Sequence, residues 1–300
     1  MEKTIAAAAQ QKNKKAVRLS PRRRVYEILM RVLLYLAAGI TAILLLFIIG
    51  TILKEGLPKL SLEFLTTEES VIRDTNGILP AIQNTLYVIV VTLLFVLPLG
   101  VGAAIYLTEY ATNRKLTAAI EFATETLGGI PSILYALVGM LVFCQMLGLG
   151  KTLLAGALTL VIMTLPTIIR TTQESLKTVP QGYREGALGL GAGKWHMIRT
   201  IVLPGSIDGI VTGCILAVGH IVGESAVLMF TAGMSTTMQD FFQKGGLWES
   251  SGGTLTVALY VYAKERADFQ LAFSVAVVLL CATLLINLAA KLCGKRLRKK

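Results

Sequence analysis

Charged residues are scarce in this chain of 300 residues, of which 16% are Asp, Glu, Lys or Arg and 54% are hydrophobic. The mean hydropathy of +0.67 lies outside the range that is usual for soluble proteins. A chain of this length would ordinarily be expected to form two soluble domains, but this composition argues against that interpretation. The composition indicates a chain whose solvent is a lipid bilayer.

Histidine and cysteine, which supply many metal ligands, are also rare. The two histidines, His196 and His220, belong to no H-E-x-x-H pattern, and the four cysteines form no C-x-x-C pair. Residues 150–152 resemble the end of a phosphate-binding loop, but Gln145 stands where that motif needs its first glycine. We therefore expect no metal site, no disulfide framework and no ATP site in this chain.

Long apolar segments are what the sequence has instead. Six of them are of membrane length and contain no Lys or Arg: residues 32–53, 81–107, 131–147, 153–169, 206–229 and 271–290. A helix needs roughly 20 residues to cross a hydrocarbon core about 30 Å thick. The sequence predicts an all-α membrane protein with six transmembrane helices, located in the cell membrane.

The formal net charge of +11 is distributed unevenly along the chain. Most Lys and Arg lie in the N-terminal tail (residues 1–31), in the C-terminal tail (291–300) and in the loops on the same side, 108–130 and 170–205. Because cytoplasmic loops are enriched in Lys and Arg, both tails are predicted to be cytoplasmic. This distribution explains the charge without nucleic acid. Residues 51–58 offer no signal-peptide cleavage site, so the first span is interpreted as uncleaved.

Two long loops, residues 54–80 and 230–270, are predicted outside the cytoplasm. Both have mixed polarity, and we expect exposed loops that could receive an extracytoplasmic partner. Inside, residues 113–127 place an apolar stripe on one face of a helix, formed by Leu116, Ile120, Ala123 and Leu127. This pattern suits an interfacial helix or a packed one.

The cytoplasmic loop 170–205 carries the most informative pattern. Pro180 can begin a short helix, and the glycines at 189, 191 and 193 would end it. Such a helix is either a handle for another protein or an ordinary connection between two spans.

The spacing of six residues in this loop resembles the EAA loop of ABC-importer membrane subunits: Glu185, Ala187, Gly191, Ile201, Leu203 and Pro204. In that family the short helix docks on the ATPase subunit and transmits ATP-driven closure to the membrane helices. The resemblance implies a type I permease fold, and an ATPase-coupling role for Glu185, Gly186, Ala187, Gly191, Leu203 and Pro204. Gly186 replaces the alanine that is common there, at a cost of about 1 kcal/mol within a helix.

Residues 129–135, 164–172 and 219–226 resemble phosphate-importer permeases of the PstA type, and the similarity extends over roughly residues 50–290. The resemblance implies a permease core at 81–290 with its coupling loop at 180–204. It also implies that the solute is phosphate and that the chain lies in a lipid bilayer. Three kinds of partner protein are implied: a second permease like PstC, two ATPase subunits like PstB that bind the ATP, and an extracytoplasmic phosphate-binding protein like PstS.

Ionisable residues inside a span are functional candidates, because a carboxylate there costs roughly 2.5–3.5 kcal/mol on insertion scales. Glu224 lies in the expected fifth span, four residues after His220 and on the same helical face. The pair forms either a gate in the pathway or a polar lock between helices. PstA-type permeases usually have arginine in place of His220, so a permanent cation is missing here.

Other pathway candidates follow from charge and from proline. Phosphate needs positive potential, which Arg170 can supply at the end of the fourth span, although the positive-inside rule also accounts for an arginine there. Ser132, Thr164 and Thr167 lie beside Pro131 and Pro166, where broken helices form a pathway wall or simply pack with a kink.

Two alternatives to a phosphate permease stay open. The first is a permease for another solute, such as molybdate, sulfate or an amino acid, which the EAA loop does not distinguish. The second is an intramembrane hydrolase that uses His220 and Glu224. An enzyme would retain turnover when purified alone, whereas a permease would need its ATPase and its binding protein.

Overall fold

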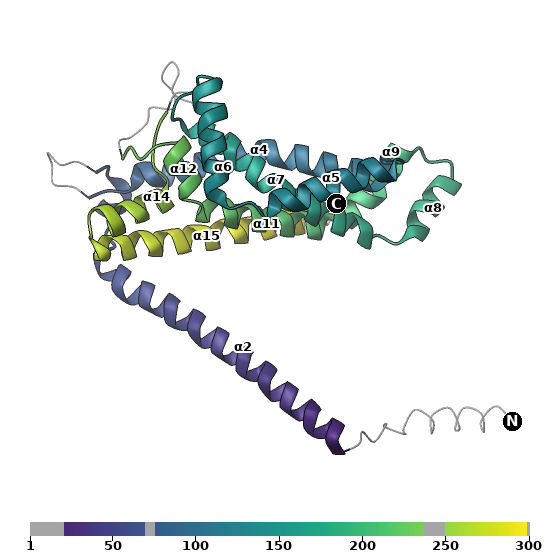
Figure 1. Ribbon diagram of the computed structural model, residues 1–300, viewed down its shortest axis with the longest axis horizontal. Helices are drawn as coiled ribbons and strands as arrows, with labels where there is room; N and C mark the ends of the chain where they lie inside the picture. Colours follow the sequence, from purple (N-terminus) through teal and green to yellow (C-terminus); the bar gives the residue numbers. More distant parts are fainter. Residues whose placement is uncertain (1–20, 70–75, 237–249, 299–300) are drawn as a thin grey trace. The chain divides into compact units, whose positions relative to one another are not determined.

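The computed structural model describes residues 21–69, 76–236 and 250–298 (Figure 1). The chain divides into two units, Met1–Leu53 and Lys54–Lys300, each of which is described by itself. Every regular element in the described ranges is a helix, as expected from the six apolar segments. Residues 1–20 and 299–300 of the two basic tails lie outside the described residues.

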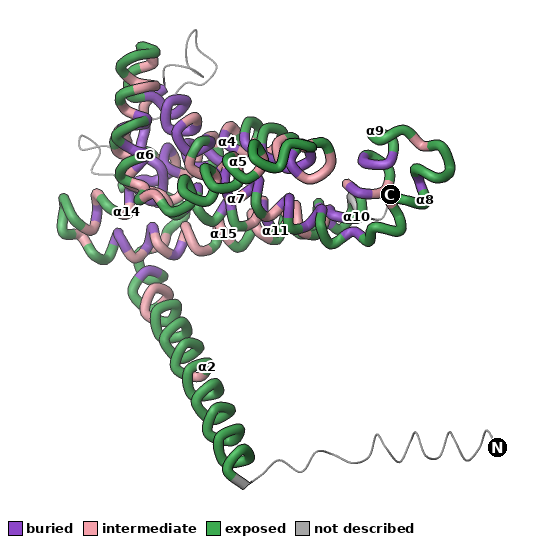
Figure 2. Tube along the Cα trace, turned by 45° about the vertical axis from the view of Figure 1, so that its right-hand side comes forward, coloured by how far each residue is buried: buried purple, intermediate pink, exposed green. Residues whose placement is uncertain are grey.

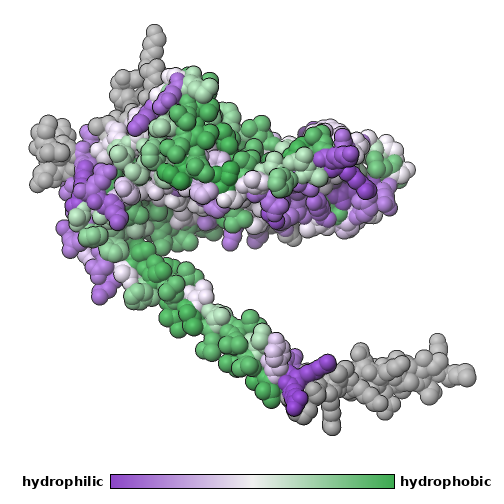
Figure 3. All heavy atoms as spheres, viewed as in Figure 1, coloured by the Kyte–Doolittle hydropathy of each residue, from purple (hydrophilic) through white to green (hydrophobic). Residues whose placement is uncertain are grey.

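The described residues of the first unit belong to helix α2 (Pro21–Gly56), which includes the expected span 32–53 and begins before it. From Ile28 to Ile49 its leucine, isoleucine and phenylalanine side chains are exposed: the tube of α2 is coloured as exposed in Figure 2, and its atoms are coloured as hydrophobic in Figure 3. A helix that is apolar all round is stable only inside a protein core or a membrane. The exposed surface of α2 therefore fits a bilayer or another membrane subunit.

The second unit is a helical bundle centred on α7 (Leu153–Thr178). Helix α7 contacts α4 (Leu79–Ile105) and α11 (Ile207–Gly223), and α11 in turn contacts α15 (Phe269–Arg298). The most apolar window of α7 is 67% buried, the largest share among the candidate spans. Its core side chains include Leu160, Ile168 and Leu176.

Glycines allow α7 to approach its neighbours closely. A Cβ atom at Gly213 of α11 would lie 2.3 Å from the hydroxyl oxygen of Thr171, and one at Gly100 of α4 would lie 2.5 Å from Ile168. In lipid, no hydrophobic effect drives helices together, so their association depends on van der Waals packing. Small residues permit this packing because they let the helix backbones approach closely. The bundle around α7 depends on these positions.

The described residues contain four helices that are long and apolar enough to cross a membrane: Arg22–Lys59, Leu79–Tyr110, Leu153–Thr178 and Phe269–Arg296. Two bent helix pairs raise the number to as many as six if each pair is one span: Arg114–Gly128 with Ser132–Met146, bent by 100°, and Lys194–Gly205 with Ile207–Gly223, bent by 66°. The six-span count and the orientation therefore stay predictions.

The sharper bend joins α5 (Arg114–Gly128) to α6 (Ser132–Gly139), which continues as a π-helix over Met140–Met146 (Figure 1). Pro131 precedes α6 and cannot continue the hydrogen bonds of α5, so the chain turns there. The Tyr135 hydroxyl donates a hydrogen bond of 2.8 Å to the Leu127 carbonyl oxygen across the bend. No residue of α5 is buried, which favours the interfacial interpretation over the packed one.

Short elements complete the described chain. They are a 3-10 helix at Leu57–Lys59, α3 (Leu62–Thr66), π-helices at Tyr106–Tyr110, Ile198–Val202 and Val261–Glu265, α8 (Gln181–Gly189), α9 (Lys194–Met197), α10 (Leu203–Gly205), α12 (Ala226–Thr231) and α14 (Leu255–Tyr260). Hydrophilic residues gather at the end of the second unit that carries α8 and α9, whereas hydrophobic residues cover α6 (Figure 3).

The second long loop differs from the exposed loop that its mixed polarity predicts. Residues 250 and 252–258 are buried, and residues 237–249 lie outside the described part. The Leu255 amide donates to the Thr85 hydroxyl at 2.9 Å, and the Asn84 side-chain amide donates to the Gly253 carbonyl oxygen at 3.1 Å. These bonds satisfy polar groups that burial would otherwise leave unpaired, so the segment can enter the bundle beside α4.

An ion pair joins the two loops predicted outside the cytoplasm. Arg266 pairs with Glu69, whose side chain is buried, and the Arg266 guanidinium lies 5.1 Å from the centre of the Tyr262 ring. Burial, followed by the charge of Glu69, raises the pKa of Tyr262 to about 12. The side of the bundle near the start of α15 is thus held by a compact polar cluster.

Candidate translocation pathway and coupling loop

Four of the six expected pathway residues line one cavity of about 380 Å³, which we name the bend cavity. It lies among the α5–α6 bend, α7 and the end of α11, and its lining includes Ser132, Thr167, His220 and Glu224 together with Leu127, Ile130, Tyr135 and Met163. The polar groups come from three separate parts of the chain. Their convergence on one cavity is the pattern expected of a ligand path.

Glu224 does not belong to a continuous fifth span, so the expected helix 206–229 was wrong. Helix α11 ends at Gly223, Glu224 has extended backbone angles, and α12 begins at Ala226. The Glu224 carboxylate accepts a hydrogen bond of 3.1 Å from the Val227 amide. This bond satisfies a backbone donor of the first turn of α12, so the side chain stabilises the break.

The break also changes the relationship between Glu224 and His220. The two residues do not share a helical face, because Glu224 has left the helix that carries His220. They border the same cavity, but no hydrogen bond or ion pair joins them in the described structure. Glu224 is held by α12, and His220 is exposed at the cavity.

Thr164 is one of two expected pathway residues that lie outside the bend cavity. Its side chain is buried, with 0% exposed, and its hydroxyl donates a hydrogen bond of 2.7 Å to the Leu160 carbonyl oxygen one turn earlier in α7. A hydroxyl satisfied within its own helix belongs to packing. Thr164 therefore has no place in the bend cavity.

Arg170 lines a second hollow of about 660 Å³ between α5 and the last turns of α7, which we name the acidic groove. Its charged lining residues are Glu121, Glu125, Glu174, Arg170 and Lys177. Arg170 lies 3.8 Å from Glu125 and 3.4 Å from Glu174, so carboxylates offset its charge. The groove shares Gly128 and Thr167 with the bend cavity, which makes the two hollows neighbours.

The predicted coupling helix is present as α8, and Pro180 precedes it. The chain turns after α8 at Gly191, whose φ of +83° is a conformation that favours glycine. Glu185 and Gly186 are exposed on α8, whereas Ala187 is buried in a cluster with Met197 and Ile198.

The last two expected coupling residues lie in α10, where Leu203 is half-buried and Pro204 is exposed. Four large apolar side chains on the coupling loop are exposed as well: Tyr183, Leu188, Leu190 and Trp195, with Leu190 reaching 92%. Where exposed apolar side chains form a contiguous patch, they are typical of a surface that contacts another protein or a membrane. The sequence pattern singled out none of these four.

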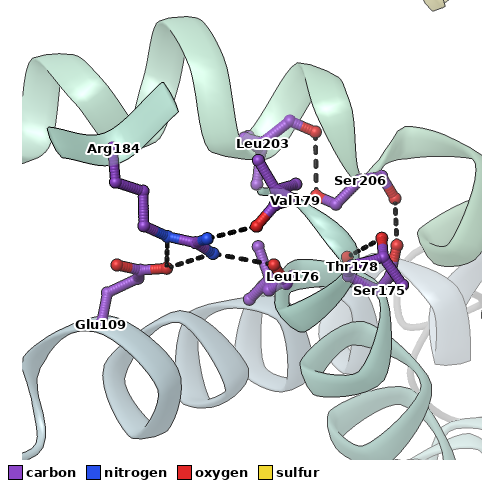
Figure 4. A network of polar contacts seen from close by, with 8 residues as sticks. All are labelled: Glu109, Ser175, Leu176, Thr178, Val179, Arg184, Leu203 and Ser206. Atoms are coloured by element: carbon purple, nitrogen blue, oxygen red, sulfur yellow. Dashed lines mark hydrogen bonds and ion pairs between the residues drawn. The ribbon is translucent and has the colours of Figure 1, made fainter. Parts of the chain in front are cut away.

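A buried ion pair that the sequence analysis missed fixes α8 to the bundle. Arg184 Nη2 lies 3.0 Å from Glu109 Oε1, and the two side chains are 11% and 7% exposed (Figure 4). The residues are 75 positions apart, so no local pattern could have paired them. The only signal in the sequence was that residues 109 and 184 carry opposite charges.

Comparison with known proteins supports this fold. Residues 96–299 match the family described as the inner membrane component of binding-protein-dependent transport systems. The probable ABC transporter permease protein YqgI of Bacillus subtilis is 34% identical over 275 residues, which is 88% of this chain and 94% of the relative. The phosphate transport system permease protein PstA of Pasteurella multocida is 30% identical over 276 residues, which is 90% of this chain and 95% of the relative.

Two solved structures are similar in fold. A bacterial alginate ABC transporter in complex with its alginate-bound periplasmic protein gives a TM-score of 0.65 at 16% identity, covering 92% of this chain and 99% of that one. The inward-facing MetNI methionine ABC transporter gives 0.58 at 19% identity, covering 73% and 95%. The expected resemblance to PstA-type permeases is confirmed by the curated relatives. This chain belongs to the ABC-importer permeases, the membrane components of binding-protein-dependent transport systems, which are transport subunits and not enzymes.

Proposed function

We propose that this chain is the permease subunit of an ATP-driven importer for inorganic phosphate. The observation that carries the choice of solute is its 30% identity to PstA of Pasteurella multocida over nearly the whole of both chains. The name of the Bacillus subtilis relative specifies no solute, so molybdate, sulfate and amino acids are the competing substrates.

The proposed arrangement has six spans with both termini in the cytoplasm. The second helix of each bent pair, Ser132–Met146 and Ile207–Gly223, then counts as the third and the fifth span respectively, and residues 180–204 form the cytoplasmic coupling loop. The basic residues of the tails and of this loop support that orientation through the positive-inside rule. The permease core occupies residues 81–290, preceded by the span 32–53 and the extracytoplasmic loop 54–80.

In the proposed complex, a second permease related to PstC, two ATPase subunits related to PstB and an extracytoplasmic phosphate-binding protein related to PstS join this chain. The exposed face of α8, with Glu185 and Gly186, docks on an ATPase, which binds the ATP. The apolar side chains of Leu190 and Trp195 extend the docking surface, because burying them removes exposed apolar area from water.

The bend cavity is the proposed part of the solute path in this subunit. Ser132, Thr167 and His220 offer hydrogen-bond donors to a phosphate oxygen, whereas Glu224 repels an anion unless the companion permease supplies a cation. Arg170 is held by carboxylates in the neighbouring groove and acts after the cavity, where the solute leaves.

The test is transport by the four-component complex reconstituted in vesicles. We expect uptake of radiolabelled phosphate that needs both ATP and the binding protein, and that is not inhibited by excess molybdate, sulfate or amino acids. ATP-dependent uptake of one of those solutes, with phosphate itself left untransported, would assign the permease to that solute. Turnover of an ester or peptide by this chain alone would favour the hydrolase.

Orientation is tested separately by labelling a Leu190→Cys variant with a membrane-impermeant thiol reagent in intact cells and in inverted vesicles. The four native cysteines are first replaced by serine. Position 190 is almost fully exposed in this chain, so the permease is labelled without its ATPase, which would cover this surface in the proposed complex. Labelling in inverted vesicles alone is expected, and labelling in intact cells would contradict the proposed topology.

A further inference from the structure

The guanidinium of Arg184 reaches from the coupling helix to the end of the second candidate span. Its Nε and Nη2 atoms lie 3.1 and 3.0 Å from the same carboxylate oxygen of Glu109. Glu109 belongs to the π-helix Tyr106–Tyr110, which directly continues α4. Both side chains are largely buried, so the pair is screened from water much less than a surface pair.

The same guanidinium also binds the end of α7. Nη2 donates a hydrogen bond of 2.8 Å to the Leu176 carbonyl oxygen, and Nη1 donates to the Val179 carbonyl oxygen (Figure 4). The Leu176 carbonyl also accepts from the Val179 amide at 3.3 Å, and Val179 directly follows α7, so Arg184 adds donors to carbonyl groups at the end of this helix, where acceptors outnumber backbone donors. One side chain therefore joins α8 to α4 and to α7.

Little else attaches α8 to the bundle. Ala187 is the one residue of α8 that is buried. Added Cβ atoms at Gly182, Gly186 and Gly189 would meet nothing within 4 Å, so three positions of this helix face open space. Besides the backbone connections to α7 and α9, a displacement of α8 then passes to the membrane helices through Arg184 and through the contact at Ala187.

The end of α7 is linked onward to α11. The Ser175 hydroxyl donates a hydrogen bond of 2.7 Å to the Ser206 carbonyl oxygen (Figure 4). A Cβ atom at Gly209 would lie 2.3 Å from the Ser175 hydroxyl oxygen. Helix α11 carries His220 near its other end and stops at the Glu224 break. Contacts thus run without interruption from Arg184 to the helix that borders the bend cavity.

We infer that Arg184 is the positioning residue that transmits movement of the coupling helix to α4 and α7. This inference rests on the proposed function, in which an ATPase moves α8. An arginine is required because its planar group presents five donors and can serve the carboxylate and both carbonyl groups together, whereas the three donors of a lysine radiate from a single nitrogen atom at the end of a flexible stem.

The experiment uses the complete reconstituted complex with Arg184→Lys and, separately, Glu109→Gln. Arg184→Lys keeps the charge, and Glu109→Gln keeps the shape of the acceptor, so each disturbs the junction mildly. Three quantities are measured: recovery of the ATPase with the permease, the rate of ATP hydrolysis, and solute uptake per ATP hydrolysed. Arg114→Lys, at an exposed arginine at the start of α5, is the matched control.

We expect both variants to assemble and to hydrolyse ATP, while uptake per ATP falls by about tenfold or more, since a buried pair weakened on one side loses much of its energy. The control should match the wild type. Unchanged uptake per ATP in both variants would overturn the inference. A parallel loss of assembly and ATP hydrolysis would also overturn it, because it would show that the ion pair has only a structural role. A wild-type complex without ATP-dependent uptake of any tested solute would instead remove the proposed function, and the inference with it.

Discussion

The hydroxyl of Thr256 donates a hydrogen bond of 3.1 Å to the backbone carbonyl oxygen of Glu224, 32 residues earlier in the chain. Glu224 stands at the break between α11 and α12, and Thr256 lies in α14 within the buried segment 250–258. The segment predicted to lie outside the cytoplasm is therefore bonded directly to the residue that borders the bend cavity. A partner that displaces this segment would act on the break through Thr256.

Thr256→Val should destabilise this junction. Valine keeps the shape of threonine but removes the donor to Glu224, and the Thr254 hydroxyl, 3.1 Å away, loses its partner as well. A lost hydrogen bond costs about 1 kcal/mol, and more where a buried group is left unsatisfied. Denaturant unfolding of the purified protein in detergent measures the loss. Thr41→Val is the control, because the Thr41 hydroxyl bonds only within α2; equal stabilities of the two variants would contradict the prediction.

Glu224→Gln and Glu224→Ala should separate the charge of this residue from its capping bond. Glutamine retains an oxygen that can accept from the Val227 amide, whereas alanine retains none. We expect the alanine variant to lose about 1 kcal/mol of stability, the usual cost of removing a helix cap. The glutamine variant should fold and insert normally but transport more slowly. Solute uptake is measured at matched expression of the variants and the wild type. Normal uptake by the glutamine variant would mean that Glu224 serves only to cap α12.

Gly186→Ala and Gly191→Ala should have opposite effects on the coupling loop. Gly186 lies within α8 and a Cβ atom there meets open space, so alanine should stabilise the helix by up to about 1 kcal/mol. Gly191 has a positive φ, which costs an alanine about 1–2 kcal/mol. Thermal unfolding of the two variants compares them directly. A stabilised Gly191→Ala variant would show that the turn after α8 does not need this conformation.

Gly213→Ala should disrupt the contact between α11 and α7. A Cβ atom at this position would lie 2.3 Å from the Thr171 hydroxyl oxygen, so the helices must move apart, and overpacking of this kind costs about 1–3 kcal/mol. Gly102→Ala is the matched control, because it lies in α4 and nothing lies within 4 Å of an added Cβ atom. We expect a lower melting temperature for Gly213→Ala alone. Similar melting temperatures would mean that the contact adjusts freely.

Much of the fold followed from local pattern. Apolar length predicted the helices at 32–53, 81–107 and 271–290, because hydropathy within about 20 residues decides whether a helix suits a bilayer. The coupling helix and its turn at Gly191 also followed from local signals, since proline and glycine act on the backbone where they stand. Four of the six pathway candidates share one cavity, although the sequence offered no distance between them.

Tertiary contacts decided the rest. The break at Glu224, the burial of residues 250–258, the position of Thr164 in the packing of α7, and the separation of Arg170 from His220 all depend on partners distant in the chain. The pairing of Arg184 with Glu109 is the clearest case, because residues 75 positions apart meet only after α4, α7 and α8 have packed. Periodicity determines which side chains a helix offers along its surface, whereas the packed bundle determines which of them meet.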